Sequence, residues 1–229
     1  ELNSIITQIH AWIIRSGTKI KRENIEDAIN LSVIGRAGVG VDNIDIEAAT
    51  NSGVVVMNLP DGNTISAAEH TMSLLSCLSR NIHLGHSGLI EGKWKRHELV
   101  GNELKNKTLG IVGLGKIGRE VMKRALSYDM KILGYDPFVN QDMFDPDTIE
   151  ITNIDKLTKF SDFITLHVPL IDDTRSLFNL NRLKLMKPTA RIINVARGGI
   201  INEKDLSTAL NGDIIAGAAI DVFENEPLD

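Results

Sequence analysis

The sequence has a single cysteine, Cys77, so no disulfide can form within the chain. This fits a reducing compartment, and we expect a cytoplasmic protein. No apolar run reaches the length of a membrane span, so no membrane association is predicted. The net charge is -5 without a broad basic region, which excludes nucleic acid as an expected partner. No signal peptide is visible, but the chain begins at Glu1 rather than methionine, which leaves targeting open.

Short apolar segments alternate with helical patterns along most of the chain. This alternation predicts an α/β fold with a doubly wound parallel sheet and helices on both faces. With 229 residues, the chain is long enough for two modest domains. No internal repeat or low-complexity segment interrupts the pattern. The expected strands are residues 11–15, 31–36, 54–58, the segment before Gly113, 131–136, 162–167, 190–195 and 214–220, and the expected helices between them are 24–29, 45–51, 154–160, 180–186 and 203–210.

The predicted boundary between two domains falls after residue 62. Residues 1–62 supply only three strands, so this segment is expected to be part of a domain. Residues 63–229 form the second domain. Its first element is predicted as one long connecting helix over residues 64–89, in which Cys77 is a small core residue. The basic run at residues 93–97 is predicted to be a solvated loop.

A glycine turn after a buried strand is the feature that points to a ligand. Gly113 permits the turn, Gly115 allows close approach of a pyrophosphate, and Gly118 lets the next helix pack on the strand. Three glycines alone are a weak signal, because such turns also serve packing. A second strand ends in Asp136 about twenty residues later, where a ribose-binding acid belongs. We therefore predict NAD rather than NADP, with a simple turn role before Pro137 as the alternative for Asp136.

The residues at the carboxyl ends of the predicted strands are chemically distinctive. Ligands bind beyond these ends in open parallel sheets, where the strand order reverses. A gathering of glycine, acids, histidine and arginine there suits a charged ligand and redox chemistry. The residues concerned are Gly113, Asp136, His167, Arg197 and Asp221.

Six motifs in one order resemble the D-isomer-specific 2-hydroxyacid dehydrogenases. Such a set is far more specific than the glycines alone, and it covers nearly the whole chain with little sign of insertion. The motifs are Arg36-Ala37-Gly38-Val39-Gly40-Val41-Asp42-Asn43, Asn63-Thr64-Ile65-Ser66-Ala67-Ala68-Glu69, the glycine turn, His167-Val168-Pro169-Leu170, Asn194-Val195-Ala196-Arg197-Gly198-Gly199 and Asp221-Val222-Phe223-Glu224-Asn225-Glu226-Pro227.

The resemblance implies two α/β domains, a Rossmann domain for NAD and a smaller flavodoxin-like domain for substrate. Residues 1–62 would be the partial substrate-binding domain. Members of the family transfer a hydride between NAD and C2 of a small 2-hydroxy acid. They are usually dimers or tetramers, so a homodimer or homotetramer is expected. No metal site is implied.

Two residues would carry catalysis by this resemblance. Arg197 would bind the substrate carboxylate and polarise the C2 oxygen, for which a forked guanidinium is suited. Glu226 would pair with the catalytic histidine and hold its ring. Without the motifs, Arg197 would be interpreted as a surface ion-pair residue and Glu226 as a loop acid.

Further contacts follow from the same motifs. Asp221 would contact the nicotinamide carboxamide, and Val39 would lie near the nicotinamide. The remaining assignments are Lys116 and Ile117 on the pyrophosphate through their backbone, Val168 and Ala196 lining the cofactor, and Arg15 and Arg36 as substrate-domain anion contacts.

The acid/base histidine of the family lies in an H-x-G-A stretch beyond the last motif found here. The chain ends at Asp229, and we expect a fragment that lacks both ends of the family's sequence and has little activity by itself. His167 is expected to have a structural role. His70 is expected to pack at a domain or subunit contact.

The identity of the acid stays open at this point. The overall resemblance favours 3-phosphoglycerate, for whose phosphate Arg15, Arg36 and Arg96 are candidate cations. Enzymes for glyoxylate, hydroxypyruvate or lactate share most of these motifs. An NAD-binding corepressor of the same family and an unrelated Rossmann protein such as a methyltransferase are the alternatives to an enzyme of this kind.

Overall fold

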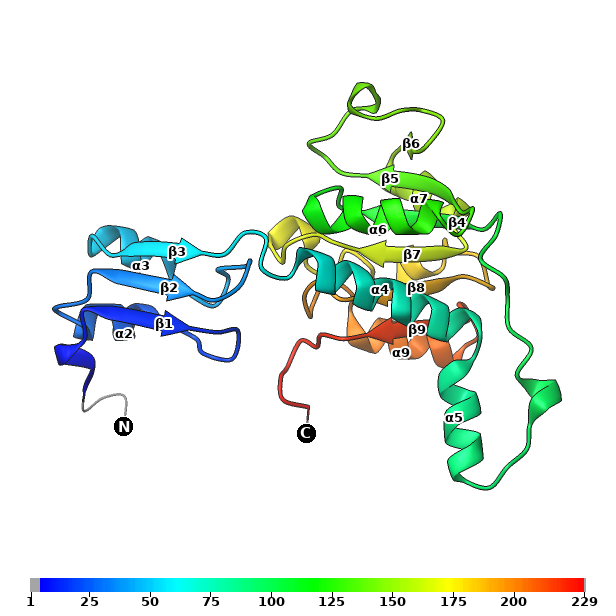
Figure 1. Cartoon of the computed structure of the whole chain (residues 1–229), viewed down its shortest axis with the longest axis horizontal. Helices are drawn as coiled ribbons and strands as arrows, with labels where there is room; N and C mark the ends of the chain where they lie inside the picture. Colours follow the sequence, from blue (N-terminus) through cyan, green and yellow to red (C-terminus); the bar gives the residue numbers. More distant parts are fainter. Residues whose placement is uncertain (1–4, 229) are drawn as a thin grey trace. The chain divides into compact units, whose positions relative to one another are not determined.

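The computed structural model describes residues 5–228 of the chain (Figure 1). The chain divides into two compact units, Glu1–Thr64 and Ile65–Asp229. This division lies close to the boundary predicted after residue 62. Each unit has its own hydrophobic core, as expected for separately packed α/β layers.

The first unit is a small parallel sheet with its helices on one face (Figure 1). Ile14 and Ile34 point into the core between the sheet and the helices. Alternate strand residues face the other way, so Ile13 and Met57 are 82% and 60% exposed. In order along the chain, the elements are η1 (Ile6–Gln8), β1 (Ala11–Ile14), α2 (Arg22–Asp27), β2 (Val33–Arg36), α3 (Ile46–Asn51) and β3 (Val55–Asn58).

The second unit contains a six-stranded parallel sheet within its described residues. The first strand along the chain, β4, is central in the sheet. β5 and β6 follow on one side of it, and β7, β8 and β9 then follow on the other side. The order of the strands therefore reverses between β4 and β7, which is where ligands bind in such sheets. Across the sheet the strands are β6 (Glu150–Ile151), β5 (Lys131–Tyr135), β4 (Thr108–Val112), β7 (Phe163–Leu166), β8 (Arg191–Asn194) and β9 (Gly217–Ile220).

Helices cover both faces of this sheet. On one face, Leu75 of α4 (Thr64–Ser79) and Val121 of α6 (Lys116–Leu126) pack against the strands. On the other, α7 (Ile154–Phe160), α8 (Leu180–Leu183) and α9 (Glu203–Asn211) form a second core layer. An asparagine side chain caps each of these three by accepting a backbone N–H, which satisfies a donor that the helix start leaves free.

The single long helix predicted over residues 64–89 is wrong. The structure has two helices, α4 and α5 (Ile82–Ile90), separated at Asn81. Asn81 has φ 53°, a left-handed conformation that asparagine tolerates and that ends the helical hydrogen-bond ladder. Cys77 is half-buried rather than in the core, and its Sγ lies 3.7 Å from His83 Nδ1. The two-residue strand β6 was not predicted, because it is too short to show a pattern.

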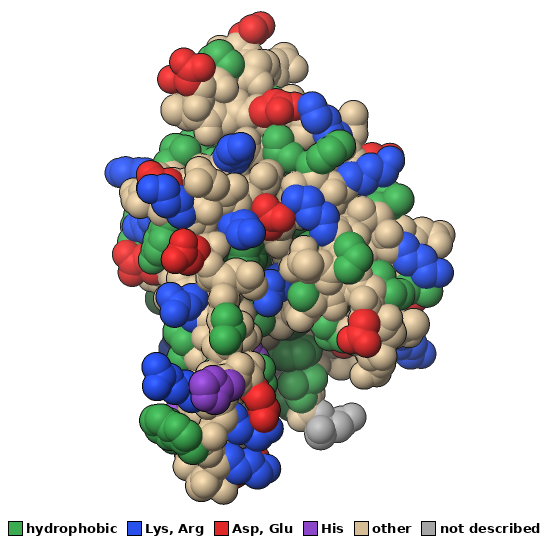
Figure 2. All heavy atoms as spheres, turned by 90° about the vertical axis from the view of Figure 1, so that its right-hand side faces the viewer, with side chains coloured by type: hydrophobic (Ala, Val, Ile, Leu, Met, Phe, Trp, Pro, Cys, Tyr) green, Lys and Arg blue, Asp and Glu red, His purple; other side chains and the backbone are tan. Residues whose placement is uncertain are grey.

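Residues 82–100, here called the arm, comprise α5, the basic run and η2 (Arg96–Glu98). In Figure 1 the arm extends away from the six-stranded sheet, and in Figure 2 basic and apolar side chains lie together on the lower projection. No residue of α5 is buried, and the run at residues 93–97 is exposed as predicted. No helix among the described residues is long and apolar enough to cross a membrane.

Candidate functional site

The glycine turn joins β4 to α6 at the point where the strand order reverses. Gly113 has φ 95°, and an added Cβ would lie 2.4 Å from the carbonyl oxygen of His167, which follows β7. A Cβ on Gly118 would lie 2.1 Å from the Gly113 oxygen. Neither clash can be relieved by a side-chain movement, because both contacts are with backbone. These two positions therefore require glycine for the turn and for close helix packing.

Gly115 differs from its two neighbours in the motif, because an added Cβ would meet no atom within 4 Å. It is the N-cap of α6, and no side chain caps the helix start there. The first N–H groups of an α-helix have no partner within the helix, and together with the helix dipole they favour an anion at this end. The open space beside Gly115 fits a diphosphate lying against the main chain.

Asp136 follows β5 and lies directly beside the glycine turn. Its Oδ2 accepts the N–H of Leu114 at 2.9 Å, and its Oδ1 accepts the N–H of Phe138 at 2.9 Å. Each carboxylate oxygen has a further lone pair, so hydrogen bonds from ribose hydroxyls remain possible. These backbone contacts fix the orientation of the carboxylate beside the glycine turn.

His167 lies next to the turn at the end of β7. Desolvation lowers the pKa of its imidazole from 6.5 to about 4. Its Nε2 is 3.0 Å from the hydroxyl oxygen of Thr165, and its backbone N–H donates to the Val112 oxygen at 2.7 Å. A neutral, hydrogen-bonded imidazole fits the structural role predicted for His167 and does not fit a proton carrier at neutral pH.

The loop after β8 carries Arg197 and is tightly fixed. Asn194 Nδ2 donates to the Arg197 oxygen at 2.8 Å, and Asn194 Oδ1 accepts the Ala196 N–H at 3.1 Å. A Cβ on Gly198 would lie 1.9 Å from the Phe223 oxygen. This loop is therefore packed on the loop after β9, so the structure brings two of the predicted motifs together.

The loop after β9 carries the two remaining predicted acids. Glu226 is exposed, and its Oε1 accepts the N–H of Phe223 at 2.9 Å. Asp221 continues the pairing of β8 and β9 through its N–H, which donates to the Asn194 oxygen at 3.0 Å. Its side chain lies 3.2 Å from Nε2 of His70 on α4, a contact that the sequence did not predict.

Three predicted residues lie in the first unit and are described there alone. Arg15 and Arg36 stand at the carboxyl ends of the adjacent parallel strands β1 and β2. Nε of Arg36 is buried without a hydrogen-bond partner among the described residues. The Val39 oxygen accepts from Asn58 Nδ2 at 2.7 Å, which ties the loop after β2 to β3.

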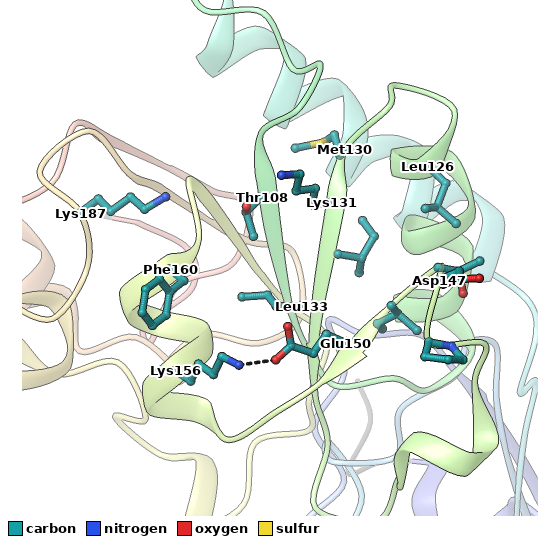
Figure 3. A pocket seen from close by; sticks show the side chains of 14 residues that line it. Thr108, Leu126, Met130, Lys131, Leu133, Asp147, Glu150, Lys156, Phe160 and Lys187 are labelled. Atoms are coloured by element: carbon teal, nitrogen blue, oxygen red, sulfur yellow. Dashed lines mark hydrogen bonds and ion pairs between the residues drawn. The ribbon is translucent and has the colours of Figure 1, made fainter.

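A cavity of about 590 Å³ lies at the opposite edge of the sheet, beside the first residues of β4 and β5 (Figure 3). Two of its lysines are paired, Lys156 with Glu150, which also lines the cavity, and Lys187 with Asp162 at 2.8 Å. Burial alone would raise the pKa of Asp162, but hydrogen bonds from Lys187 and the Thr108 N–H hold it below its ordinary value. None of the predicted site residues lines this cavity.

No three histidine, cysteine or acidic side chains within residues 5–228 are arranged to hold a metal ion. The predicted cofactor residues of the second unit instead surround the glycine turn and the two loops beyond β8 and β9. A helix start beside open space and a carboxylate fixed by backbone N–H groups suit a dinucleotide at this edge.

Comparison with known proteins decides the family. Residues 72–229 match the family model described as D-isomer specific 2-hydroxyacid dehydrogenase, NAD binding domain. The chain belongs to the D-isomer-specific 2-hydroxyacid dehydrogenases. The residues around the glycine turn are thus part of this family's NAD-binding domain, and NAD is its cofactor.

Curated proteins with assigned names align with this chain over its whole length. It is 48% identical over 228 residues to a D-3-phosphoglycerate dehydrogenase of Synechocystis, covering 100% of the chain and 41% of that relative. It is 49% identical over 228 residues to one of Methanocaldococcus jannaschii, covering 99% of the chain and 44% of that relative. The chain therefore spans less than half the length of these curated relatives.

Solved structures of dehydrogenases in this family share the fold. An NAD-dependent formate dehydrogenase from Staphylococcus aureus in complex with NAD superimposes with a TM-score of 0.91, at 34% identity, covering 100% of the chain and 69% of that protein. A D-lactate dehydrogenase from Aquifex aeolicus, complexed with NAD and lactic acid, gives a TM-score of 0.90 at 29% identity, covering 98% of the chain and 67% of that protein. Both likenesses confirm the predicted α/β fold.

Proposed function

We propose that the protein to which this chain belongs oxidises 3-phosphoglycerate to 3-phosphohydroxypyruvate with NAD, in the synthesis of L-serine. The observation that carries this proposal is the 48% and 49% identity, along the whole chain, to two enzymes named D-3-phosphoglycerate dehydrogenase. The coarser activity, hydride transfer between NAD and C2 of a D-2-hydroxy acid, rests on the family itself.

The second unit would hold the dinucleotide. Lys116 and Ile117 would donate their backbone N–H groups to the diphosphate, and Asp136 would accept from the ribose hydroxyls. Asp221 would accept from the nicotinamide carboxamide. Bound NAD supplies the hydride acceptor. The walls of the site are assigned to Val168, Ala196 and, in the first unit, Val39.

Arg197 and Glu226 are the proposed catalytic residues of this chain. The Arg197 guanidinium would bind the substrate carboxylate through its forked donors and stabilise charge on the C2 oxygen. The rigid backbone that Asn194 gives to the Arg197 loop supports such a positioning role. Glu226 would accept from the acid/base histidine, which the family resemblance assigns to a segment after Asp229.

Arg15 and Arg36 are proposed to bind the anionic groups of the substrate. A phosphorylated acid carries more negative charge than lactate or glycerate, so cations remote from the carboxylate would favour it. The position of both residues at the carboxyl ends of adjacent parallel strands supports this assignment.

The substrate is best tested with the protein encoded by the complete gene. Initial rates of NAD reduction would be compared for 3-phosphoglycerate, D-glycerate and D-lactate at matched concentrations. We expect kcat/KM to be highest for 3-phosphoglycerate, by at least about tenfold, since a paired phosphate is worth a charge-assisted hydrogen bond or more. Equal or better rates with D-glycerate or D-lactate would contradict the phosphoglycerate assignment and leave the family chemistry intact.

We also propose that the protein forms a homodimer or homotetramer, and that the arm contributes to its interface. In support, α5 buries none of its residues within the chain, and a cavity of about 530 Å³ lies between apolar and basic arm residues. Exposed apolar area of this kind marks interaction surfaces. Ile82, Leu84, Leu89, Ile90 and Trp94 are each more than half exposed.

Light scattering of the 229-residue chain tests the assembly. We expect a mass of two or four chains, and a shift toward a single chain when Ile90 and Trp94 are both replaced by aspartate. A monomeric wild-type chain at micromolar concentration would contradict the role of the arm. A cytoplasmic location stays a prediction that depends on the single cysteine of the sequence.

A further inference from the structure

An imidazole and a carboxylate from distant parts of the sequence meet at the carboxyl edge of the six-stranded sheet. Nε2 of His70, on the second turn of α4, lies 3.2 Å from Oδ1 of Asp221, which follows β9. Both side chains are 46% exposed. The pair therefore connects the first helix of the second unit to the loop that also carries Glu226.

The position of His70 is set by α4 as a whole. Ala68 and Met72, on either side of it along the helix, are 0% and 6% exposed and belong to the core. The neighbouring residue Glu69 lies 3.4 Å from Arg124 of α6. With the helix fixed by these contacts, a change at the half-exposed His70 side chain removes a polar contact without removing core packing.

The backbone and the side chain of Asp221 are held by different partners. Its backbone is fixed by the N–H that donates to the Asn194 oxygen at 3.0 Å. Among the side chains of the described residues, His70 lies within ion-pair distance of its carboxylate, with Nε2 3.2 Å from Oδ1. A carboxylate with one oxygen held keeps its second oxygen in a defined position and free to accept another hydrogen bond.

We propose that His70 is a positioning residue for the nicotinamide half of the cofactor. By donating from Nε2 to Oδ1 of Asp221, His70 holds the carboxylate so that Oδ2 accepts the carboxamide N–H of the nicotinamide. The proposal rests on the carboxamide contact assigned to Asp221 in the proposed function. It extends the cofactor site to α4, a helix that carries none of the residues assigned to the cofactor from the sequence.

The diagnostic test compares two ligands that differ only in the nicotinamide. NAD and ADP-ribose share the adenosine, the diphosphate and the second ribose, but ADP-ribose lacks the ring and its carboxamide. Dissociation constants would be measured by calorimetry on the 229-residue chain. For His70→Leu we expect the Kd of NAD to rise by about 3- to 10-fold, the value of one hydrogen bond, while the Kd of ADP-ribose stays unchanged.

Rescue and control variants make the test specific. In His70→Gln, the amide Nε2 can donate from nearly the position of the imidazole Nε2, so we expect an NAD affinity close to that of the wild type. Asp221→Ala should weaken NAD relative to ADP-ribose at least as much as His70→Leu. His86→Leu, on the exposed α5, should change neither ligand.

The outcomes separate this inference from the proposed function. If Asp221→Ala weakens NAD selectively and His70→Leu does not, the role of His70 is wrong and the role of Asp221 stands. If His70→Leu weakens NAD and ADP-ribose equally, the residue supports the fold and does not position the carboxamide acceptor. If the wild-type chain binds ADP-ribose and NAD equally well, the nicotinamide contact of Asp221 itself is wrong.

Discussion

Oδ2 of Asp136 accepts the backbone N–H of Leu114 at 2.9 Å, which joins the end of β5 to the glycine turn. The two features that predicted a dinucleotide from the sequence are thus in direct contact. The contact explains why the acid and the glycines act as one unit: the turn orients the carboxylate, and the carboxylate restrains the turn.

The first prediction concerns the choice between NAD and NADP. In Asp136→Ala, the acceptor for the ribose hydroxyls is lost, and we expect the Kd of NAD to rise by about 10- to 100-fold. The Kd of NADP should stay level or fall, because the negative charge that repels a 2′-phosphate is gone. Fluorescence titration with both cofactors measures this, with the exposed Asp142→Ala as the matched control. Equal NAD and NADP affinities in the wild type would contradict the role of Asp136.

The second prediction distinguishes the packing role of Gly118 from the proposed ligand-binding role of Gly115. Gly118→Ala places a Cβ 2.1 Å from the Gly113 oxygen, and we expect a loss of about 1–3 kcal/mol in unfolding free energy. Gly115→Ala places its Cβ in open space, so the unfolding free energy should change by no more than about 0.5 kcal/mol.

NAD affinity should fall in Gly115→Ala, the variant whose stability should hardly change. The open space beside Gly115 is where the diphosphate is proposed to lie, so Gly115→Ala should bind NAD more weakly although it is stably folded. Urea denaturation and NAD titration on both variants make the comparison. A Gly115→Ala protein with wild-type affinity for NAD would place the diphosphate elsewhere.

How much of this site follows from the sequence depends on how local its signals are. The strands, the glycine turn and the acid Asp136 are set by short-range patterns, and the structure has them where the patterns put them. The break at Asn81 was missed because residues 64–89 are helical on both sides of it, and only a positive φ at one residue ends the helix. The contact between His70 and Asp221 joins two elements that are far apart in the sequence, so no local sequence pattern could predict it.

The third prediction concerns Arg197 in the protein encoded by the complete gene. Arg197→Ala removes the guanidinium that would stabilise charge on the C2 oxygen, and kcat/KM for the hydroxy acid should fall by about 10²- to 10³-fold. Arg197→Ala also removes the bond from Arg197 Nη1 to the Ala196 oxygen at 2.6 Å. The loop should nevertheless keep its shape, because Asn194 holds the Arg197 oxygen and the Ala196 N–H. NAD affinity should therefore be unchanged. The matched control is the exposed Arg175→Ala, and a loss of similar size in that variant would argue against a specific role for Arg197.

The fourth prediction is a pH dependence of stability that comes from His167. Its pKa is about 4 in the folded protein and about 6.5 in an unfolded chain. Between these values the unfolded chain binds a proton that the folded protein does not. The unfolding free energy should therefore fall as the pH is lowered from 6.5 to 4, by about 3 kcal/mol at most because His167 keeps partial exposure.

Urea denaturation of wild type and His167→Gln at pH 7 and pH 4.5 measures this contribution. Carboxylates titrate in both proteins, so the difference between the two pH slopes isolates the imidazole. We expect a shallower slope in His167→Gln. Identical slopes would mean that the His167 ring is hydrated enough to accept a proton in the folded state.

A crystal structure of the 229-residue chain with NAD tests the central claim most directly. The account predicts the diphosphate within hydrogen-bonding distance of the Lys116 and Ile117 N–H groups, and a ribose hydroxyl on Asp136. Bound NAD at any other place, such as the cavity at the amino ends of β4 and β5, with solvent beside Gly115, would contradict it.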